Sequence, residues 1–206
     1  GIDVDHFSPQ NSAQLRKELK IDDKRVIVSV GRLVHRKGQD HLIQAMPEIL
    51  KRVPDAHILM VGQGPYLSHL KKLVQELNLV DHVSFIGRIQ YAQLPQYICA
   101  GDIFAMPSRS RFFGLEVEGL GIVYLEASAC GLPVIAGSSG GAPDAVLAGV
   151  TGKVVDGENN QEIAAAAIKF LQDLPASKAM GLAGREWIIE NWRWEIWSDR
   201  FNKLLQ

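Results

Sequence analysis

Short runs of β-branched and apolar residues alternate with longer amphipathic runs along most of the chain. The first short run, RVIVSV at residues 25–30, has charged residues before it and Gly31 after it. This pattern is typical of a parallel strand that is covered on both faces. Similar short runs follow at residues 57–61, 83–86, 103–106, 133–136 and 153–155. Strands that alternate with helices predict βα units and a parallel sheet.

Amphipathic segments with apolar residues at helical spacing fill the connections. The expected helices cover about residues 39–51, 67–77, 93–99, 122–130 and 160–173, with another opening near Pro143. Six strands and their helices predict an α/β fold, a Rossmann-like doubly wound sheet of six parallel strands. Ligands of such sheets bind at the carboxyl ends of the strands.

Two further helices, at about residues 176–190 and 194–205, exceed what this sheet needs. The four tryptophans all lie in this last stretch, which is typical of a packing surface. They are Trp187, Trp192, Trp194 and Trp197. Two interpretations stay open: the tryptophans cover the sheet of this domain, or a second body docks on them.

Composition narrows the class of protein. The 206 residues suffice for one compact domain, and 47% apolar with 22% charged residues excludes a disordered chain. The net charge of -1 gives no indication of a nucleic-acid partner. Cys99 and Cys130 lack the spacing of a zinc site, and no apolar run approaches the roughly 20 residues that span a bilayer. We therefore expect a cytoplasmic protein.

Basic and glycine residues follow the first two strands. Arg32 and Lys37 come after the first strand with Gly31 before them, and a guanidinium with an ammonium suits two phosphates. A solvated basic loop is the alternative. Gly62 follows the second strand and would let a ligand approach the backbone, although a tight turn would also explain it.

The long connection at residues 107–121 leads into a helix with further candidate residues. Gly121 precedes the helix, so the N–H groups of Ile122 and Val123 would be free to bind a phosphate. Glu126, one turn inside, could accept hydrogen bonds from a ribose diol, and Glu118 could reach another hydroxylated group. Ordinary helix and loop charges are the alternative for both carboxylates.

Five motifs occur together in one order along nearly the whole chain. They are Gly31-Arg-Leu with Lys37-Gly, Gly62-Gln-Gly-Pro65, Phe85-Ile-Gly87, Glu118-x7-Glu126 and Gly140-Gly-Ala-Pro143. In this they resemble the C-terminal, donor-binding domain of the retaining nucleotide-sugar glycosyltransferases of the GT-B fold. Asp144 departs from the family, where a glutamate is commoner, and either acid suits a helix N-terminus.

The resemblance implies a role for each candidate residue. Arg32 and Lys37 would hold the donor diphosphate, joined by the backbone of Gly121, Ile122 and Val123. Glu126 would bind the ribose, Glu118 a hydroxyl of the donor sugar, and the backbone of Arg88 and Ile89 the base, beside the end of the third strand. Gly31 and Gly62 would also belong to the donor-binding residues. Arg32, Lys37 and Glu118 would be the catalytic residues. The resemblance implies no cofactor and no metal, because preplaced cations and N–H groups stabilise the departing diphosphate.

The loop at residues 111–123 looks most like that of GDP-mannose-dependent mannosyltransferases that act on phosphatidylinositol mannosides. It implies GDP-mannose as the donor and an inositol lipid as the acceptor. The alternatives are a UDP-sugar-dependent transferase or epimerase of the same fold, and a nucleotide-binding fragment that is inactive alone. A glycosidase that uses Glu116 or Glu118 is a further rival.

The resemblance also implies the domain organisation. Residues 1–9, which begin without a methionine, would be an interdomain connector, and residues 10–192 the donor-binding domain. Residues 193–206 would form a helix that packs toward an N-terminal acceptor domain absent from this chain. The lipid acceptor would be met by the full enzyme at the cytoplasmic face of the plasma membrane, where the enzyme would be peripheral. No nucleic acid is expected as a partner.

Overall fold

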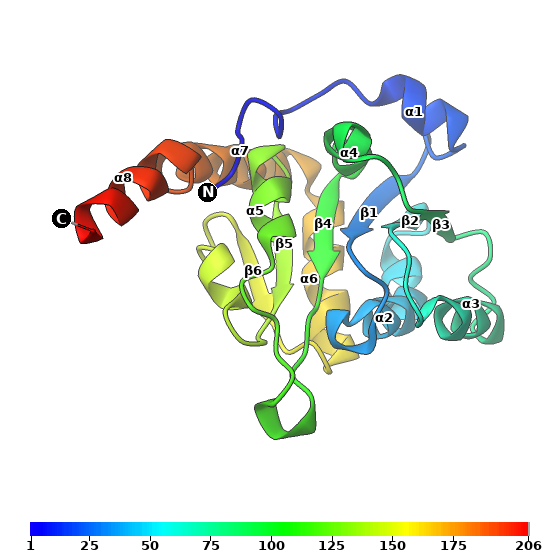
Figure 1. The fold of residues 1–206 in the computed structure, drawn as a ribbon. Helices are drawn as coiled ribbons and strands as arrows, with labels where there is room; N and C mark the ends of the chain where they lie inside the picture. Colours follow the sequence, from blue (N-terminus) through cyan, green and yellow to red (C-terminus); the bar gives the residue numbers. More distant parts are fainter. Residues whose placement is uncertain (206) are drawn as a thin grey trace.

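A computed structural model describes residues 1–205, without the side chain of Phe113; Gln206, the end of the range expected to form the last helix, lies outside it. The strands form one all-parallel sheet in the order β3-β2-β1-β4-β5-β6 (Figure 1). They are β1 (Arg25–Val30), β2 (Ala56–Val61), β3 (Val83–Gly87), β4 (Ile103–Met106), β5 (Val134–Gly137) and β6 (Gly152–Val155). This is the doubly wound order, so the predicted fold class is confirmed.

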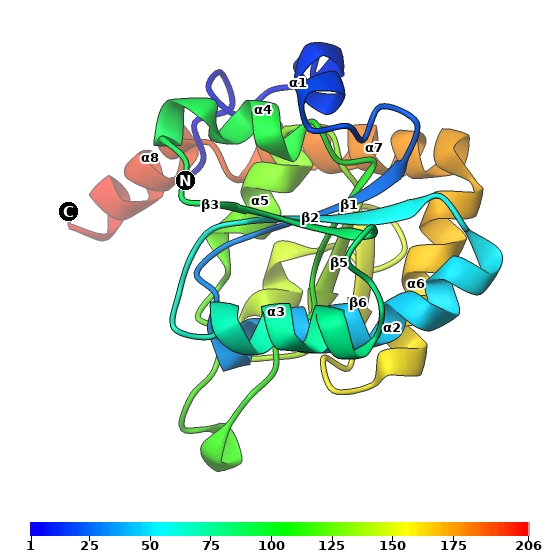
Figure 2. The same cartoon turned by 90° about the vertical axis from the view of Figure 1, so that its right-hand side faces the viewer.

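Helices cover both faces of the sheet (Figures 1 and 2). Helices α1, α4, α5 and α7 share one apolar core with the sheet, and α2, α3 and α6 share the other. The helices are α1 (Ala13–Glu18), α2 (Gln39–Arg52), α3 (Leu67–Glu76), α4 (Leu94–Ile98), α5 (Ile122–Ala129), α6 (Asn160–Gln172), α7 (Leu174–Asn191) and α8 (Trp194–Leu204).

The central strand β1 shows why the sheet needs two layers of helices. Val26, Val28 and Val30 belong to the core beneath α5 and α7, whereas Ile27 belongs to the core beneath α2 and α6. Successive side chains of a strand point to opposite faces, so a continuous apolar run is buried only when both faces are covered. The sheet therefore leaves its strand ends as the place for a polar site.

Two local elements differ from the expectation. Helix α1 was not predicted, because it has only six residues and buries Leu15 alone, so its pattern has no periodicity to detect. The segment at Pro143 is a short 3₁₀ turn, η4 (Ala142–Ala145), and no longer helix follows it. The chain leaves helical geometry at Val146, whose backbone is extended.

The four tryptophans of the C-terminal helices differ in burial: two pack on this domain, and two lie on an exposed helix. Trp187 and Trp192 pack against the core, with ring centroids 5.8 Å apart. Trp194 and Trp197 are 56% and 37% exposed, and α8 buries none of its described residues. In Figure 1 this helix leads away from the body of the domain. The first pair thus covers this domain. Trp197 lies with its ring centroid 5.3 Å from that of Trp192 and donates to the Asn191 carbonyl oxygen over 3.1 Å, so the second pair keeps only part of its surface exposed.

The first residues of the chain lie against the start of α8. The Ile2 N–H donates to the carbonyl oxygen of Trp192 over 2.6 Å, and Arg185 of α7 donates to the carbonyl oxygens of Val4 and Phe7. Residues 1–9 are therefore fixed to α7 rather than free, and their role as a connector stays a prediction. Nowhere in residues 1–205 does a helix combine the length and the hydropathy needed to cross a bilayer.

Candidate functional site

Four of the predicted residues line one cavity at the carboxyl ends of β1, β2 and β3. Gly31, Gly62, Arg88 and Ile89 surround a space of about 280 Å³, together with Tyr91. Gly62 has a φ of 135°, and a Cβ there would overlap the carbonyl oxygen of Gly31. Glycine is thus required for the two strand ends to meet. The structure brings these four residues together, and their role in donor binding stays a prediction.

Lys37 and Glu118 form a buried ion pair beside this cavity. The Lys37 Nζ lies 2.9 Å from the Glu118 Oε2, and the side chains are only 11% and 7% exposed. The Lys37 Cε lies 4.0 Å from the place that a Cβ on Gly31 would take, so the ammonium is at the end of β1. The alternative of solvated loop charges is wrong for this pair. Arg32, in contrast, is exposed.

The Gly140-Gly motif holds Glu118 in place. The Glu118 N–H donates to the Ser139 Oγ over 3.0 Å, and the Gly141 N–H donates to the Glu118 carbonyl oxygen over 3.0 Å. A Cβ on Gly140, whose φ is 54°, would overlap that same carbonyl oxygen. The turn after β5 therefore needs glycine so that it can pack against the backbone of Glu118.

Gly121 directly precedes helix α5, and its left-handed φ of 72° lets the loop enter the helix sharply. Tyr124 fixes the first turn: its hydroxyl donates to the Met106 carbonyl oxygen over 2.7 Å and lies 2.9 Å from the Ser108 Oγ. Burial raises the pKa of Tyr124 far above its ordinary value, so the phenol stays neutral. The N–H groups of Ile122 and Val123 lie in the first turn of α5, where the helix provides no carbonyl acceptor for them, so they are available to an anion.

Glu126 is a buried carboxyl on the second turn of α5. Burial raises its pKa from 4.5 to about 7, and no other group in the described residues contributes to that shift. Burial and then the Glu126 carboxylate raise the pKa of Tyr91, although Glu126 itself is not among the residues that line the cavity. A buried acid without a charged partner is typical of a functional position.

A second polar group at the strand ends was not predicted from the sequence. Asp40 and Arg109 are joined by two hydrogen bonds of 2.9 and 2.7 Å, with Arg109 only 3% exposed. His35 accepts from the Arg109 Nε over 3.2 Å, and the Tyr66 hydroxyl donates to Asp40 over 3.0 Å. We call these four side chains the strand-exit network, because they come from the segments after β1, β2 and β4.

The sequence holds little signal for this network. Asp40 lies in the first turn of α2, where an acid is explained by the helix dipole. Arg109 lies 69 residues further along the chain, in a long loop that also contains Arg111. The length of the loop is the one signal for a site there, because connections within a compact domain are usually shorter.

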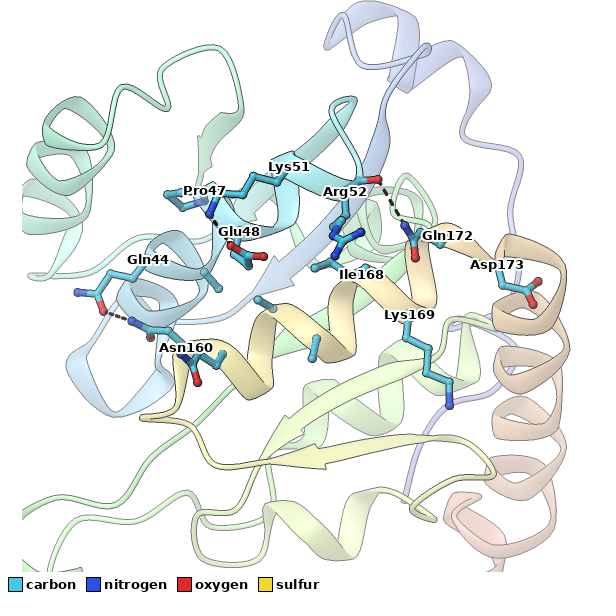
Figure 3. A pocket seen from close by; sticks show the side chains of 14 residues that line it. Gln44, Pro47, Glu48, Lys51, Arg52, Asn160, Ile168, Lys169, Gln172 and Asp173 are labelled. Carbon is cyan, nitrogen blue, oxygen red and sulfur yellow. Dashed lines mark hydrogen bonds and ion pairs between the residues drawn. The ribbon is translucent and has the colours of Figure 1, made fainter.

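A larger hollow of the surface lies elsewhere. A groove of about 1000 Å³ runs between α2 and α6, where Gln44 accepts from Asn160 and Lys51 pairs with Glu48 (Figure 3). None of the predicted site residues lines it. Within residues 1–205, no three His, Cys, Asp or Glu side chains gather as metal ligands would. Independence from metal stays a prediction.

Comparison with known proteins agrees with the geometry of the site. Residues 11–187 match the family described as "Glycosyl transferases group 1". The GDP-mannose-dependent alpha-(1-6)-phosphatidylinositol monomannoside mannosyltransferase of Mycolicibacterium smegmatis is 48% identical over 207 residues, which cover 100% of this chain and 54% of that protein. The chain thus spans about half the length of this curated relative.

Solved structures extend the likeness to three dimensions. A sucrose-phosphate synthase from Thermosynechococcus elongatus matches with a TM-score of 0.86 and 31% identity, over 100% of this chain and 50% of its own. The Anabaena protein HepE in complex with UDP matches with a TM-score of 0.89 and 24% identity, over 100% and 55%. This last likeness shows the fold alone. The family match covers most of the chain and agrees with the resemblance of its motifs: the chain belongs to the group 1 glycosyl transferases.

Proposed function

We propose that this chain is the donor-binding half of a retaining mannosyltransferase that takes GDP-mannose as its donor. The observation that carries the proposal is the buried pair of Lys37 and Glu118, placed next to a glycine-lined cavity at the end of β1. A nucleotide sugar needs this combination, because its diphosphate requires a cation, its base a cavity and its sugar hydroxyls an acceptor. The similarity to the Mycolicibacterium mannosyltransferase supports GDP-mannose over other donors.

Each part of the donor then has its own residues. The base enters the cavity formed by Gly31, Gly62, Arg88 and Ile89, where main-chain groups read its edge. The ribose diol donates to Glu126, which is buried on the second turn of α5. These two contacts fix the nucleoside, and they leave the diphosphate facing β1 and α5.

The diphosphate and the sugar meet the charged residues. Lys37 and the exposed Arg32 bind the phosphates, together with the N–H groups of Ile122 and Val123 behind Gly121. Glu118 accepts a hydrogen bond from a hydroxyl of the sugar. Donor binding therefore divides the ion pair, with Lys37 turned to the phosphate and Glu118 to the sugar.

Catalysis in this arrangement is stabilisation of the leaving group. As the bond between the sugar and the diphosphate breaks, negative charge grows on the phosphate oxygen beside Lys37 and α5. The acceptor hydroxyl attacks the anomeric carbon from the face that the diphosphate leaves, and its proton passes to the departing phosphate. Attack from this face retains the configuration of the sugar. No nucleophile of the protein and no metal takes part.

The acceptor belongs to a part of the enzyme beyond this chain. We place an inositol lipid acceptor on an N-terminal domain, which the greater length of the relatives supports. The exposed Trp194 and Trp197 of α8 are suited to pack toward that domain. The full enzyme would then act as a peripheral protein at the cytoplasmic face of the plasma membrane, and this chain alone would bind the donor without transferring it.

Calorimetric titration of GDP, UDP and ADP against this chain tests the proposal. GDP should bind most tightly, and tighter binding of UDP would contradict the assignment to GDP-mannose while leaving the fold intact. This chain joined to the N-terminal half of the Mycolicibacterium relative should transfer mannose to a phosphatidylinositol mannoside. Sugar epimerised with the donor alone would indicate an epimerase instead.

The glycosidase alternative has less support. Glu116 pairs with Arg111 over 3.2 Å and with Arg36 over 3.5 Å, and Glu118 pairs with Lys37. Both carboxylates are engaged by cations, whereas a glycosidase needs one carboxylic acid that is free to protonate the leaving group. Release of reducing sugar from a glycoside without any nucleotide would revive this alternative.

A further inference from the structure

Arg109 does not face the cavity, yet it contacts the residues on both sides of Lys37. We propose that Arg109 is a positioning residue of the donor site, which holds the Lys37 ammonium where the donor diphosphate binds. The proposal rests on the function proposed above, because it takes Lys37 as the cation that meets the diphosphate. The argument comes from the contacts of the strand-exit network.

The contacts of Arg109 bracket Lys37 along the chain. Its backbone N–H donates to the Arg36 carbonyl oxygen over 2.8 Å, and its Nε donates to the His35 Nδ1 over 3.2 Å. Its two terminal nitrogens donate to Asp40 over 2.9 and 2.7 Å. One residue of the loop after β4 thus holds the turn after β1 both before and after Lys37.

The acceptors of this network are themselves fixed. The Tyr66 hydroxyl donates to the Asp40 Oδ2 over 3.0 Å, which brings in the segment after β2. Burial opposes the charge of Asp40, but Arg109 and then Tyr66 outweigh it and lower the pKa of the carboxyl below its usual value. Burial and then the Arg109 cation lower the pKa of His35, so its Nδ1 can accept a hydrogen bond. The partners of the Arg109 guanidinium are therefore fixed acceptors, and they hold this planar group in one orientation.

Stability alone gives weak reason for such a pair. A buried ion pair is expensive to desolvate, and apolar side chains of similar volume often replace one without loss. What apolar side chains could not supply is the planar fork, which fixes Asp40 and the backbone around Lys37 in direction as well as distance. Lysine at this position would keep the charge and lose the fork.

Arg109 acts on the ligand through Lys37 and not by contact. Its side chain is only 3% exposed, and its guanidinium donates to Asp40 and His35. A small shift of the turn after β1 would move the Lys37 ammonium away from the diphosphate and toward Glu118 alone. A charge-assisted hydrogen bond depends on the distance and the direction of its partners, so such a shift weakens the contact with the diphosphate.

A double-mutant cycle on this chain tests the inference. GDP is titrated by calorimetry into the parent chain, Arg109→Lys, Lys37→Ala and the double variant. Arg109→Lys should weaken GDP binding about tenfold in the parent, and less than about twofold when Lys37 is already alanine, because residues that act as one unit are not additive. A purely structural role would give the same factor in both backgrounds.

The matched control is Arg16→Lys, which alters another arginine–aspartate pair, with Asp102 at 3.2 Å, at the opposite end of the sheet. It should lower the melting temperature and leave GDP affinity unchanged. If Arg109→Lys does not fold, Tyr66→Phe replaces it in the cycle, since it removes one hydroxyl from Asp40. It should give a smaller loss of affinity that again disappears in the Lys37→Ala background.

The outcomes separate the two proposals. If Lys37→Ala leaves GDP affinity unchanged, the diphosphate assignment fails, and this inference fails with it. If Lys37→Ala weakens GDP binding but the effect of Arg109→Lys is fully additive, only the positioning role is overturned. An Arg109→Lys variant with parent affinity for GDP overturns it as well.

Discussion

The Nζ of Lys37 lies 2.9 Å from the Oε2 of Glu118, and this pair joins the turn after β1 to the long loop after β4. The reversal of strand order between these two strands is where doubly wound sheets bind their ligands. The opposite charges of the two side chains stabilise each other at this reversal. Under the proposed function, the donor would take both groups as partners, Lys37 through its phosphates and Glu118 through its sugar.

Replacing Lys37 by alanine should weaken GDP binding by about tenfold or more. A hydrogen bond to a charged group contributes about 1.5–3 kcal/mol, and every 1.4 kcal/mol corresponds to about a factor of ten. The net contribution of Lys37 to GDP binding is smaller than this, because its ammonium must first leave the carboxylate of Glu118 in the parent chain. Lys51→Ala is the matched control, since this exposed lysine of α2 pairs with Glu48 and does not line the cavity. Calorimetry at constant salt measures both, and a loss of GDP affinity in the control would point to general electrostatics instead.

Glu118→Gln should separate the nucleotide from the sugar. The amide keeps the shape of the carboxylate and removes the charge that holds Lys37, so GDP should bind as tightly as to the parent or a few times more tightly. A donor hydroxyl loses a charged acceptor, so the ratio of GDP-mannose to GDP affinity should fall about three- to tenfold. Competition titration measures the ratio, and an equal loss for both ligands would place Glu118 at the nucleotide instead.

The strands could be predicted because each is a short apolar run that must be buried on two faces. Predicted and observed bounds agree within about a residue, as at Arg25–Val30. The cavity could also be predicted, since parallel strands bring their carboxyl ends to one edge and glycine marks where backbones approach. Gly31 and Gly62 followed from this reasoning. Local pattern and sheet geometry thus suffice for the frame of the site.

The pairing of the charges could not be predicted. Lys37 reaches Glu118 only because the loop at residues 107–121 contacts the turn after β1, where the Arg109 N–H donates to the Arg36 carbonyl oxygen. The path of the loop depends in turn on Ser139 and Tyr124. The same holds for Asp40 and Arg109, whose 69-residue separation leaves no periodic signal. Sequence reasoning identified which residues could bind an anion, but tertiary contacts decide which of them are held in place.

Gly38→Ala should destabilise the fold more than the same change at Gly149. Both glycines are left-handed, with φ of 71° and 82°, so alanine adds a backbone strain of about 1–2 kcal/mol at either position. At Gly38 a Cβ would also overlap the Pro107 carbonyl oxygen, whereas nothing lies within 4 Å of a Cβ at Gly149. Gly38→Ala should therefore lose an additional 1–3 kcal/mol or so of unfolding free energy.

Urea denaturation of the two variants measures this difference, and calorimetry with GDP adds a second readout. Because Gly38 follows Lys37 directly, its alanine variant should also lose GDP affinity, and Gly149→Ala should not. Equal destabilisation by the two changes would show that the turn after β1 can move away from Pro107 without penalty.

The carboxyl of Glu126 should make ribose recognition depend on pH. Burial raises its pKa from 4.5 to about 7, so near neutrality a part of the chains carries a neutral acid there. The ionised form accepts two hydrogen bonds from a diol, and the neutral form accepts less well. As the pH rises from 6 to 8, the preference for GDP over 2′-deoxy-GDP should increase about threefold or more, on the order of one charged hydrogen bond.

The ratio of the two affinities is the measurement of choice, because both nucleotides carry the same diphosphate and its own titration cancels. Glu126→Gln should abolish the pH dependence of this ratio.

The raised pKa of Glu126 should also make the stability of the ligand-free chain depend on pH, because the folded state binds the proton more tightly than the unfolded state does. The stability from this group is therefore full below pH 4.5 and lost as the pH rises through about 7. Glu126→Gln should thus be more stable, relative to the parent, at pH 8 than at pH 5, and a stability difference that does not change with pH would mean that Glu126 is ionised throughout.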